Sequence, residues 1–143
     1  MRTIGYTESD HFGDFPAPVE ILSHDDQDPP GMQFYSNAAT KLADRCHVMF
    51  PAAFYTKNQT GRSHLAWSRD GVRFTRYGRV PMVDVGTGFD SKGVYVCSGA
   101  VPGDKPNTWW FYCFGTRMGH DGTSVANTHF ENGIGRFLLV KIK

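Results

Sequence analysis

The sequence has little net charge and no long apolar run. Its 15 Lys and Arg residues nearly balance its 14 Asp and Glu residues, which leaves a net charge of +1. This balance provides no field to gather the phosphates of a nucleic acid or a membrane surface, so we expect neither as a partner. No stretch reaches the roughly 20 apolar residues of a membrane span, and the first residues lack the apolar core of a signal peptide. The chain as written is therefore expected in the cytoplasm.

Cysteine is also scarce. Cys46, Cys97 and Cys113 are odd in number and show no CxxC spacing. This pattern argues against a disulfide framework and against a zinc knuckle. We therefore predict buried free thiols, with no metal and no cofactor.

Aromatic residues and glycine are plentiful, and they indicate an all-β protein. Aromatics make up 14% of the sequence, which also contains 16 glycines, and this pairing is typical of many short strands and tight turns. At 143 residues the chain has enough material for one domain. Runs rich in β-branched and aromatic residues predict strands at 2–7, 19–23, 46–55, 64–67, 93–101, 108–115 and 134–142.

Two segments need separate interpretation. Residues 37–46, "NAATKLADRC", have a composition that also suits a short helix, and we interpret them as strand, turn and strand. The runs "GVYVCSGAV" and "TWWFYCFG" are apolar at nearly every position, which predicts strands covered on both faces by stacked sheets. The adjacent Trp109 and Trp110 should then point to opposite faces of their strand.

An internal repeat links two short segments. "SDHFGDF" from Ser9 and "SRDGVRF" from Ser68 align at an offset of about 59 residues, with Phe15 at the position of Phe74. In the second copy a hydroxyl, a carboxylate and a glycine are typical of a turn, and we expect the aromatic to hold that hairpin on the core. Repeats of this length with four strands each indicate propeller blades.

Four longer motifs carry a resemblance to a known family. They are "HLAWSRDGVRFTR", "GFDSKGVYVCSG", "TWWFYCFGTRMGHDG" and "GIGRFLLVKIK", preceded by an acidic, proline-bearing segment that leads to "MFPAAFY". Together they resemble the five-bladed β-propeller glycoside hydrolases, a clan that includes arabinanases, xylosidases, invertases and levansucrases. The resemblance implies four-stranded antiparallel blades and a carbohydrate ligand in a central funnel.

The chain is too short for such a ring. We expect a single partial propeller domain over residues 1–143, with repeats at 2–60 and 61–133 and the start of a third at 134–143. A five-bladed ring at this spacing needs roughly twice that length. Either the chain belongs to a longer protein, or two copies form a homo-oligomer that completes a propeller and covers the apolar strands.

Two carboxylates are candidates for catalysis. In the clan, converging carboxylates protonate the leaving oxygen and act as base or nucleophile. The resemblance implies that Asp90 in "GFDS" is the proton donor and that Asp28 in "QDPPG" positions or tunes it. From the residues alone, Asp28 also fits a carboxylate that caps a turn, and Asp90 fits one that accepts backbone hydrogen bonds where a strand begins. No clear equivalent of the clan's nucleophile is present.

Four further residues are candidates for substrate binding. His120 in "RMGHDG" corresponds to a histidine near the ring axis in the clan, although a solvent-exposed turn histidine fits the sequence as well. Tyr35 and Trp67 lie near turns and could stack on a sugar ring. Arg117, like Arg69, could bind a carboxylated sugar.

Two functions from different classes follow from these features. The leading prediction is a glycoside hydrolase-like protein that acts on or binds a carbohydrate, in active or catalytically degenerate form. The alternative is a non-enzymatic interaction module built from propeller blades. An enzyme requires two carboxylates that converge on a pocket, whereas an interaction module requires none.

Overall fold

A computed structural model of the chain describes residues 2–122 and 132–141. These residues form strands and turns without a helix, which confirms the all-β prediction. The described part of the chain accordingly offers no helix that could span a membrane. The strands are β1 (Ile4–Tyr6), β2 (Val19–Leu22), β3 (Met32–Ala43), β4 (Cys46–Tyr55), β5 (Thr60–Ser63), β6 (Ala66–Ser68), β7 (Thr75–Arg76), β8 (Gly93–Val96), β9 (Val101–Pro102), β10 (Thr108–Thr116) and β11 (Asn132–Val140).

Strands β3 to β7 form an antiparallel group that we call the middle sheet. One edge of β4 pairs with β3 along nearly its whole length, and the other edge pairs first with β6 and then with β5. Strand β7 pairs with β6. The chain reverses between β3 and β4 at Arg45, whose φ of 52° lies in the left-handed region typical of tight turns. The predicted strand, turn and strand over residues 37–46 is therefore confirmed.

Strands β8, β10 and β11, with the short β9, form a second antiparallel group that we call the upper sheet. Strand β10 lies between β8 and β11 and pairs with β11 over nine residue pairs, from Thr108↔Val140 to Thr116↔Asn132. A single parallel pair, Gly61↔Gly93, joins this group to the middle sheet. The single strand predicted over residues 93–101 is wrong, because Gly99 adopts a φ of 97° and breaks the run into β8 and β9.

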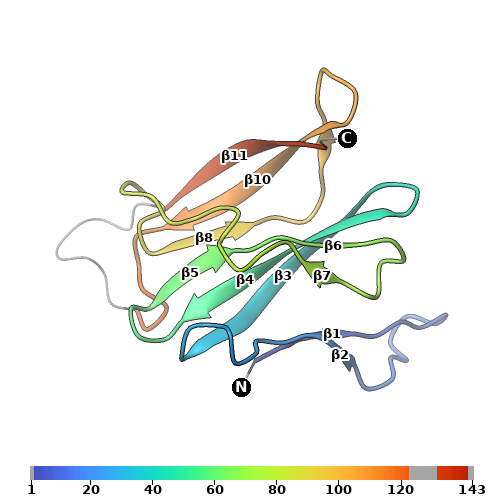
Figure 1. The fold of residues 1–143 in the computed structure, drawn as a ribbon, viewed down its shortest axis with the longest axis horizontal. Coiled ribbons are helices and arrows are strands. Elements are labelled where there is room, and N and C mark those ends of the chain that lie inside the picture. Colours follow the sequence, from blue (N-terminus) through green and yellow to red (C-terminus); the bar gives the residue numbers. More distant parts are fainter. Residues whose placement is uncertain (1, 123–131, 142–143) are drawn as a thin grey trace.

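Strands β3 to β11 form one nine-stranded sheet whose β8–β11 part folds over its β3–β7 part, so that with the β1–β2 ribbon the protein has three layers (Figure 1). The β1–β2 ribbon lies on one face of the middle sheet, and the upper sheet lies on the other. Burial of each large apolar side chain between layers contributes roughly 1.5–3 kcal/mol, so these contacts hold the layers together. The cluster between the middle and upper sheets contains Ala38, Val48, Phe50, Leu65, Val94, Val96, Phe111 and Cys113. The cluster beneath the middle sheet contains Ile4, Leu22, Met32, Phe34, Met49, Ala53 and Ala66.

A bulge at Tyr35 changes which face of β3 is buried. Phe34 pairs with Ala53, but Ser36 already pairs with Ala52, so Tyr35 is an extra residue in the ladder. Phe34 packs toward the β1–β2 ribbon, whereas Ala38, also even in number, packs toward the upper sheet. Because side chains alternate along a strand, one inserted residue moves the following side chains to the opposite face. Strand β3 thereby contributes to both apolar clusters.

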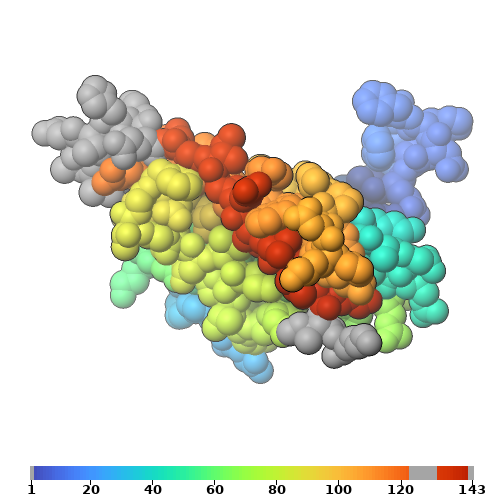
Figure 2. All heavy atoms as spheres, turned by 90° about the horizontal axis from the view of Figure 1, so that it is seen from above, coloured from blue at the N-terminus to red at the C-terminus, as the bar shows by residue number. Residues whose placement is uncertain are grey.

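The two repeat segments form related turns with different packing. Ser68 Oγ accepts hydrogen bonds from the backbone N–H groups of Asp70 and Gly71, at 3.1 and 2.9 Å. Ser9 Oγ accepts one from the N–H of His11 at 3.1 Å. Phe74 packs against the cluster beneath the middle sheet, as predicted. Its counterpart Phe15 is 52% exposed, because the loop between β1 and β2, the blue segment in Figure 2, projects from the body.

The upper sheet is covered on one face only. Trp109 packs toward the cluster between the sheets, whereas Trp110 faces outward with the Arg136 guanidinium 4.6 Å from its ring centre. The expectation that these two side chains oppose each other is confirmed. Tyr112 and Phe114, also on the outward face of β10, are 42% and 40% exposed, so the prediction that this strand is covered on both faces differs from the structure.

The three cysteines are free and differ in exposure. Cys113 is buried, Cys46 is half-buried and Cys97 is exposed. The buried-thiol prediction is therefore confirmed for Cys113 and wrong for Cys97, which lies where the chain leaves β8.

Candidate functional site

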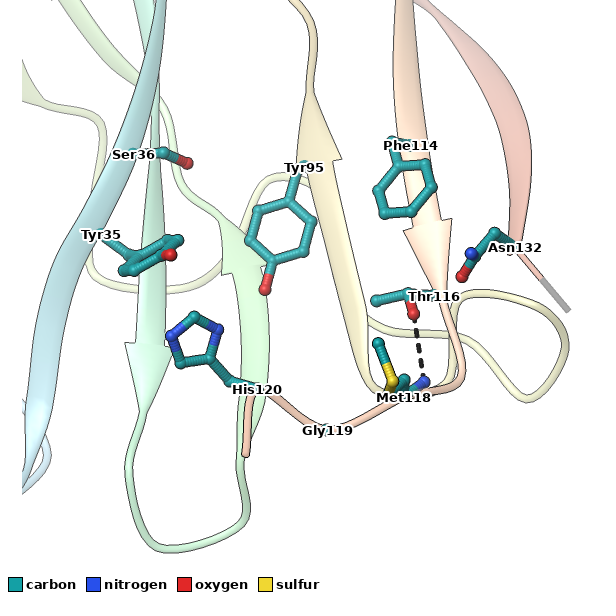
Figure 3. Close-up of a pocket in the computed structure, with 9 residues that line it drawn as sticks. All are labelled: Tyr35, Ser36, Tyr95, Phe114, Thr116, Met118, Gly119, His120 and Asn132. Atoms are coloured by element: carbon teal, nitrogen blue, oxygen red, sulfur yellow. Dashed lines mark hydrogen bonds between the residues drawn. The ribbon is translucent and has the colours of Figure 1, made fainter. Parts of the chain in front are cut away.

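A pocket of about 400 Å³ lies where β3, β8 and β10 approach the segment that follows β10 (Figure 3). We call it the His120 pocket. Its volume falls within the range of small-molecule sites. No Asp or Glu is present among the described residues that line it. The lining residues are Tyr35, Ser36, Tyr95, Phe114, Thr116, Met118, Gly119, His120 and Asn132.

Aromatic contacts position His120 in this pocket. Its ring centre lies 4.5 Å from that of Tyr35 and 4.8 Å from that of Phe54. Figure 3 shows the imidazole between Tyr35 and Tyr95, close to the Tyr95 hydroxyl. Upstream, the segment is anchored because Thr116 Oγ1 accepts a hydrogen bond from the Met118 N–H at 3.1 Å. The structure thus brings together two of the predicted binding residues, His120 and Tyr35.

The ring of Tyr35 is already occupied by other protein groups. The Arg2 guanidinium carbon lies 4.8 Å from its centre, and His120 contacts it edge-on. Tyr35 sits at the bulge of β3, which turns it out of the regular alternation toward the pocket. These contacts make Tyr35 a support for His120 rather than a free stacking surface.

Tyr95 and Phe114 provide the aromatic surface that the sequence prediction missed. They are directly paired across β8 and β10, and Phe114 is 40% exposed. Gly61 makes room for the Tyr95 phenol, since a Cβ at Gly61 would overlap it. Burial raises the pKa of the Tyr95 hydroxyl, so this group stays protonated at neutral pH and can donate a hydrogen bond.

A sequence signal for this pair was present but ambiguous. Tyr95 and Phe114 lie in the two apolar runs whose composition predicts strands covered on both faces. Only the pairing register shows that both rings lie side by side on the uncovered face, next to Thr116 and Asn132.

Asp28 lies outside the residues that line the His120 pocket and is held in an ion-pair network. Both its carboxylate oxygens accept hydrogen bonds of 2.7 Å from Arg76, and Oδ1 accepts another from Arg79 at 3.1 Å. Oδ2 also accepts a hydrogen bond from the Asp25 N–H at 3.0 Å. Burial alone would raise the pKa of Asp28, but these partners outweigh it and lower the pKa to about 2. Such a carboxylate remains ionised and links the loop before β3 to β7.

Asp90 lies on the side of β10 opposite to Phe114 and Thr116. A Cβ built on Gly115 would come within 2.8 Å of the Asp90 Cβ, so Asp90 packs over the inward face of β10 at that glycine. Its carboxylate also lies against Gly86, where a Cβ would be 2.6 Å from Oδ1. Gly115 and Thr116 are neighbours on β10 and therefore face opposite sides of this strand. Asp90 lies on the Gly115 side, whereas the His120 pocket lies on the Thr116 side.

The other two predicted binding residues do not line the His120 pocket. Trp67 is 43% exposed and lines a different groove with Trp109 and Leu139. Arg117 follows β10 directly and is half-buried, between the lining residues Thr116 and Met118. Among the described residues, no group of three or more His, Cys, Asp or Glu side chains could hold a metal ion.

The chemistry of the His120 pocket is that of neutral polar recognition beside aromatic rings. It combines one imidazole, hydroxyls from serine, threonine and tyrosine, and the amide of Asn132. No protein-family model, curated protein or solved structure matches this chain.

Proposed function

We propose that this protein binds a neutral carbohydrate in the His120 pocket. The observation that carries the proposal is the cross-strand pair of Tyr95 and Phe114 beside His120, Thr116 and Asn132. Sugars present apolar C–H faces and polar hydroxyl rims, which match an aromatic surface bordered by hydrogen-bonding groups. The family resemblance of the sequence points to the same class of ligand.

A neutral ligand fits better than an acidic sugar. The described lining residues include no Lys, Arg, Asp or Glu, so the pocket offers no ion pair to a carboxylated ligand. Imidazole, hydroxyl and amide groups can both donate and accept hydrogen bonds, as sugar hydroxyls do. The sequence-based hypothesis that Arg117 binds a carboxylate is therefore not part of this proposal.

Binding without hydrolysis is the form of the proposal that the site residues favour. Glycosidases of the usual type hold two carboxyl groups roughly 5–10 Å apart around the scissile bond. Asp28 is occupied by Arg76 and Arg79, and Asp90 packs on the far side of β10. We retain Asp90 as the candidate proton donor to be tested, and assign Asp28 a structural role.

We further propose that the layers are blades of a β-propeller. The middle sheet, which packs face to face against the upper sheet and the β1–β2 ribbon, supports this interpretation. Within the middle sheet, β3, β4, β6 and β7 pair in this order as four antiparallel strands, which is the composition of one blade, and β5 pairs with β4 beside β6. In this proposal a second copy of the chain packs on the outward face of the upper sheet.

That outward face favours a second candidate function, an interaction module. Outside the His120 pocket, it exposes Ile134, Leu138 and Val140 of β11 at 77%, 42% and 53%, next to Tyr112 of β10. Figure 2 views the molecule from this side, with β10 and β11 in orange and red. Exposed apolar patches of this kind mark interaction surfaces in soluble proteins.

The sugar-binding proposal is tested by titration with a panel of neutral mono- and oligosaccharides, followed by saturation-transfer NMR. We expect binding of at least one sugar, with affinity reduced at least about tenfold in Phe114→Ala and His120→Ala, since each loses contact area or hydrogen bonds. Trp67→Ala is the matched control, because it removes an exposed aromatic that lies outside the pocket. Binding that is unaffected by both pocket variants, or absent for the whole panel, would refute the proposal.

Hydrolysis is tested separately with aryl glycosides. We expect no release of the aryl group above the uncatalysed rate in the wild-type protein, and none in Asp90→Asn. Release by the wild type that Asp90→Asn abolishes would instead restore the hydrolase prediction, with Asp90 as the acid.

A further inference from the structure

A second pocket lies at the opposite end of the two stacked sheets. Residues of the His120 pocket come from the end of β10 and the start of β11, whereas this groove includes Trp109 at the start of β10 and Leu139 near the end of β11. Its volume is about 340 Å³, and we call it the Trp67 groove. The lining residues are Leu42, Cys46, Val48, Leu65, Trp67, Tyr77, Trp109, Leu139, Val140 and Lys141.

The groove has a fixed apolar floor and an exposed rim. Val48 and Leu65 belong to the cluster between the sheets and are 6% and 8% exposed. Trp67 and Tyr77 at the rim are 43% and 65% exposed. The floor is part of the packed core, so the groove exists before any ligand arrives.

One cationic residue lies at the rim. Among the described lining residues, Lys141 is the only ionisable one besides Cys46 and Tyr77, and no ion pair joins it to a described carboxylate. Its backbone is anchored, since the Lys141 N–H donates to the Asn107 carbonyl at 3.0 Å. The backbone of Lys141 is therefore fixed beside the apolar groove, within reach of which its side chain carries a positive charge.

From this arrangement we propose that the Trp67 groove binds an apolar monocarboxylate, such as a medium-chain fatty acid. The hydrocarbon lies on the floor of Val48 and Leu65 between Trp67 and Trp109, and the carboxylate pairs with Lys141. The other described lining residues supply no competing charge. This site is separate from the His120 pocket and does not depend on the proposed sugar binding.

Tryptophan fluorescence provides a direct test, because two of the three tryptophans line the groove. The third, Trp110, faces the opposite side of β10. In the variant Trp110→Phe, all tryptophan fluorescence therefore comes from the two residues that line the groove. In this background we titrate decanoate and decanol below their aggregation limits. We expect decanoate to quench or shift the tryptophan emission in a saturable way. Decanol has the same hydrocarbon chain without the charge, so the affinity for decanoate should be about fivefold higher than that for decanol.

The role of Lys141 is tested by substitution. Lys141→Met should reduce the decanoate affinity to that of decanol, and Lys141→Arg should retain the preference, because only the positive charge is required. Lys57→Met is the matched control, since Lys57 is an exposed lysine in the turn after β4. Equal affinities for decanoate and decanol, or a preference that survives Lys141→Met, would overturn the assignment of the carboxylate partner.

A second measurement locates the ligand. Cys46 lines the groove, so decanoate should slow alkylation of Cys46 by N-ethylmaleimide and leave the exposed Cys97 unaffected. Decanoate that protects neither thiol binds elsewhere, and the proposal is then wrong. The proposal is also wrong if a second copy of the chain covers the groove. In that case Cys46 would be protected from alkylation without ligand, and the protection would increase with protein concentration.

Discussion

His64 is an imidazole held neutral inside the middle sheet. It is 1% exposed, its Nε2 lies 3.1 Å from the Tyr55 hydroxyl, and its Nδ1 has no hydrogen-bond partner among the described residues. Burial first, and then the charges of Arg76 and Arg62, lower the pKa of His64 to about 4, although Asp28 and Asp84 oppose this. The imidazole of His64 therefore binds a proton less readily in the folded protein than in the unfolded chain.

The stability of the fold should depend on this histidine between pH 6.5 and 4. The folded pKa lies below the unfolded value of 6.5, so the unfolded state binds more protons in this window and stability falls as pH falls. The loss attributable to His64 should approach about 3 kcal/mol at pH 4. We expect His64→Gln to be less stable at neutral pH but to lack this part of the pH dependence.

Urea unfolding at a series of pH values measures this effect. His11→Gln is the control, because His11 is exposed in the loop between β1 and β2. Equal pH dependence of the wild type and His64→Gln between pH 6.5 and 4 would show that His64 titrates similarly in both states.

At the scale of single elements, the Ser9 and Ser68 turns share one sequence pattern but lie in different environments. Ser68 is 1% exposed and its hydroxyl also donates to Asp70 Oδ1 at 2.9 Å. Asp70 in turn accepts from the N–H groups of Val72 and Arg73, and these backbone bonds, Arg73 foremost, lower the pKa of its carboxyl. The bonds of the Ser9 turn are exposed to solvent. The pattern therefore specifies the turn in both copies, and burial determines how much it stabilises.

Ser68→Ala should cost about 1–2 kcal/mol of unfolding free energy, because two backbone N–H groups of a partly buried turn lose their acceptor. Ser9→Ala should change stability by less than about 0.5 kcal/mol, since water replaces the lost bonds. Denaturant midpoints of the two variants and the wild type provide the comparison. Similar costs for both substitutions would contradict the assigned difference in burial.

At the scale of the whole molecule, the uncovered face of the upper sheet governs assembly. The middle sheet contributes buried side chains to a cluster on each of its faces, but β10 and β11 present apolar side chains to solvent on one side. Removal of such a patch from water is the main driving force for association of folded chains. The proposed second copy would cover it.

We predict that the protein is a dimer in solution and that Ile134→Asp with Leu138→Asp weakens the dimer at least about a hundredfold. Sedimentation equilibrium over a range of concentrations measures this, with circular dichroism to verify folding of the variant. Val80→Asp is the matched control, since Val80 is 73% exposed in the connection between β7 and β8. A wild-type protein that stays monomeric at high concentration would rule out the second copy as occupant.

Much of the local architecture could be predicted from the amino-acid sequence. The all-β class, the strand at 46–55, the turn within 37–46 and the opposed directions of Trp109 and Trp110 depend on local alternation and turn chemistry. So does the Ser68 turn, whose hydrogen bonds join residues only two or three positions apart. Such features require no knowledge of distant parts of the chain.

The tertiary structure alone decided which side chains share a site. Asp28 meets Arg76 across 48 residues, and no local pattern predicts that this candidate carboxylate forms an ion pair. The register of β8 and β10 pairs Tyr95 with Phe114, and the single extra residue at Tyr35 turns that side chain toward His120. Strand partners and register are set by long-range packing, so local patterns predicted the strands but not the contents of the pocket.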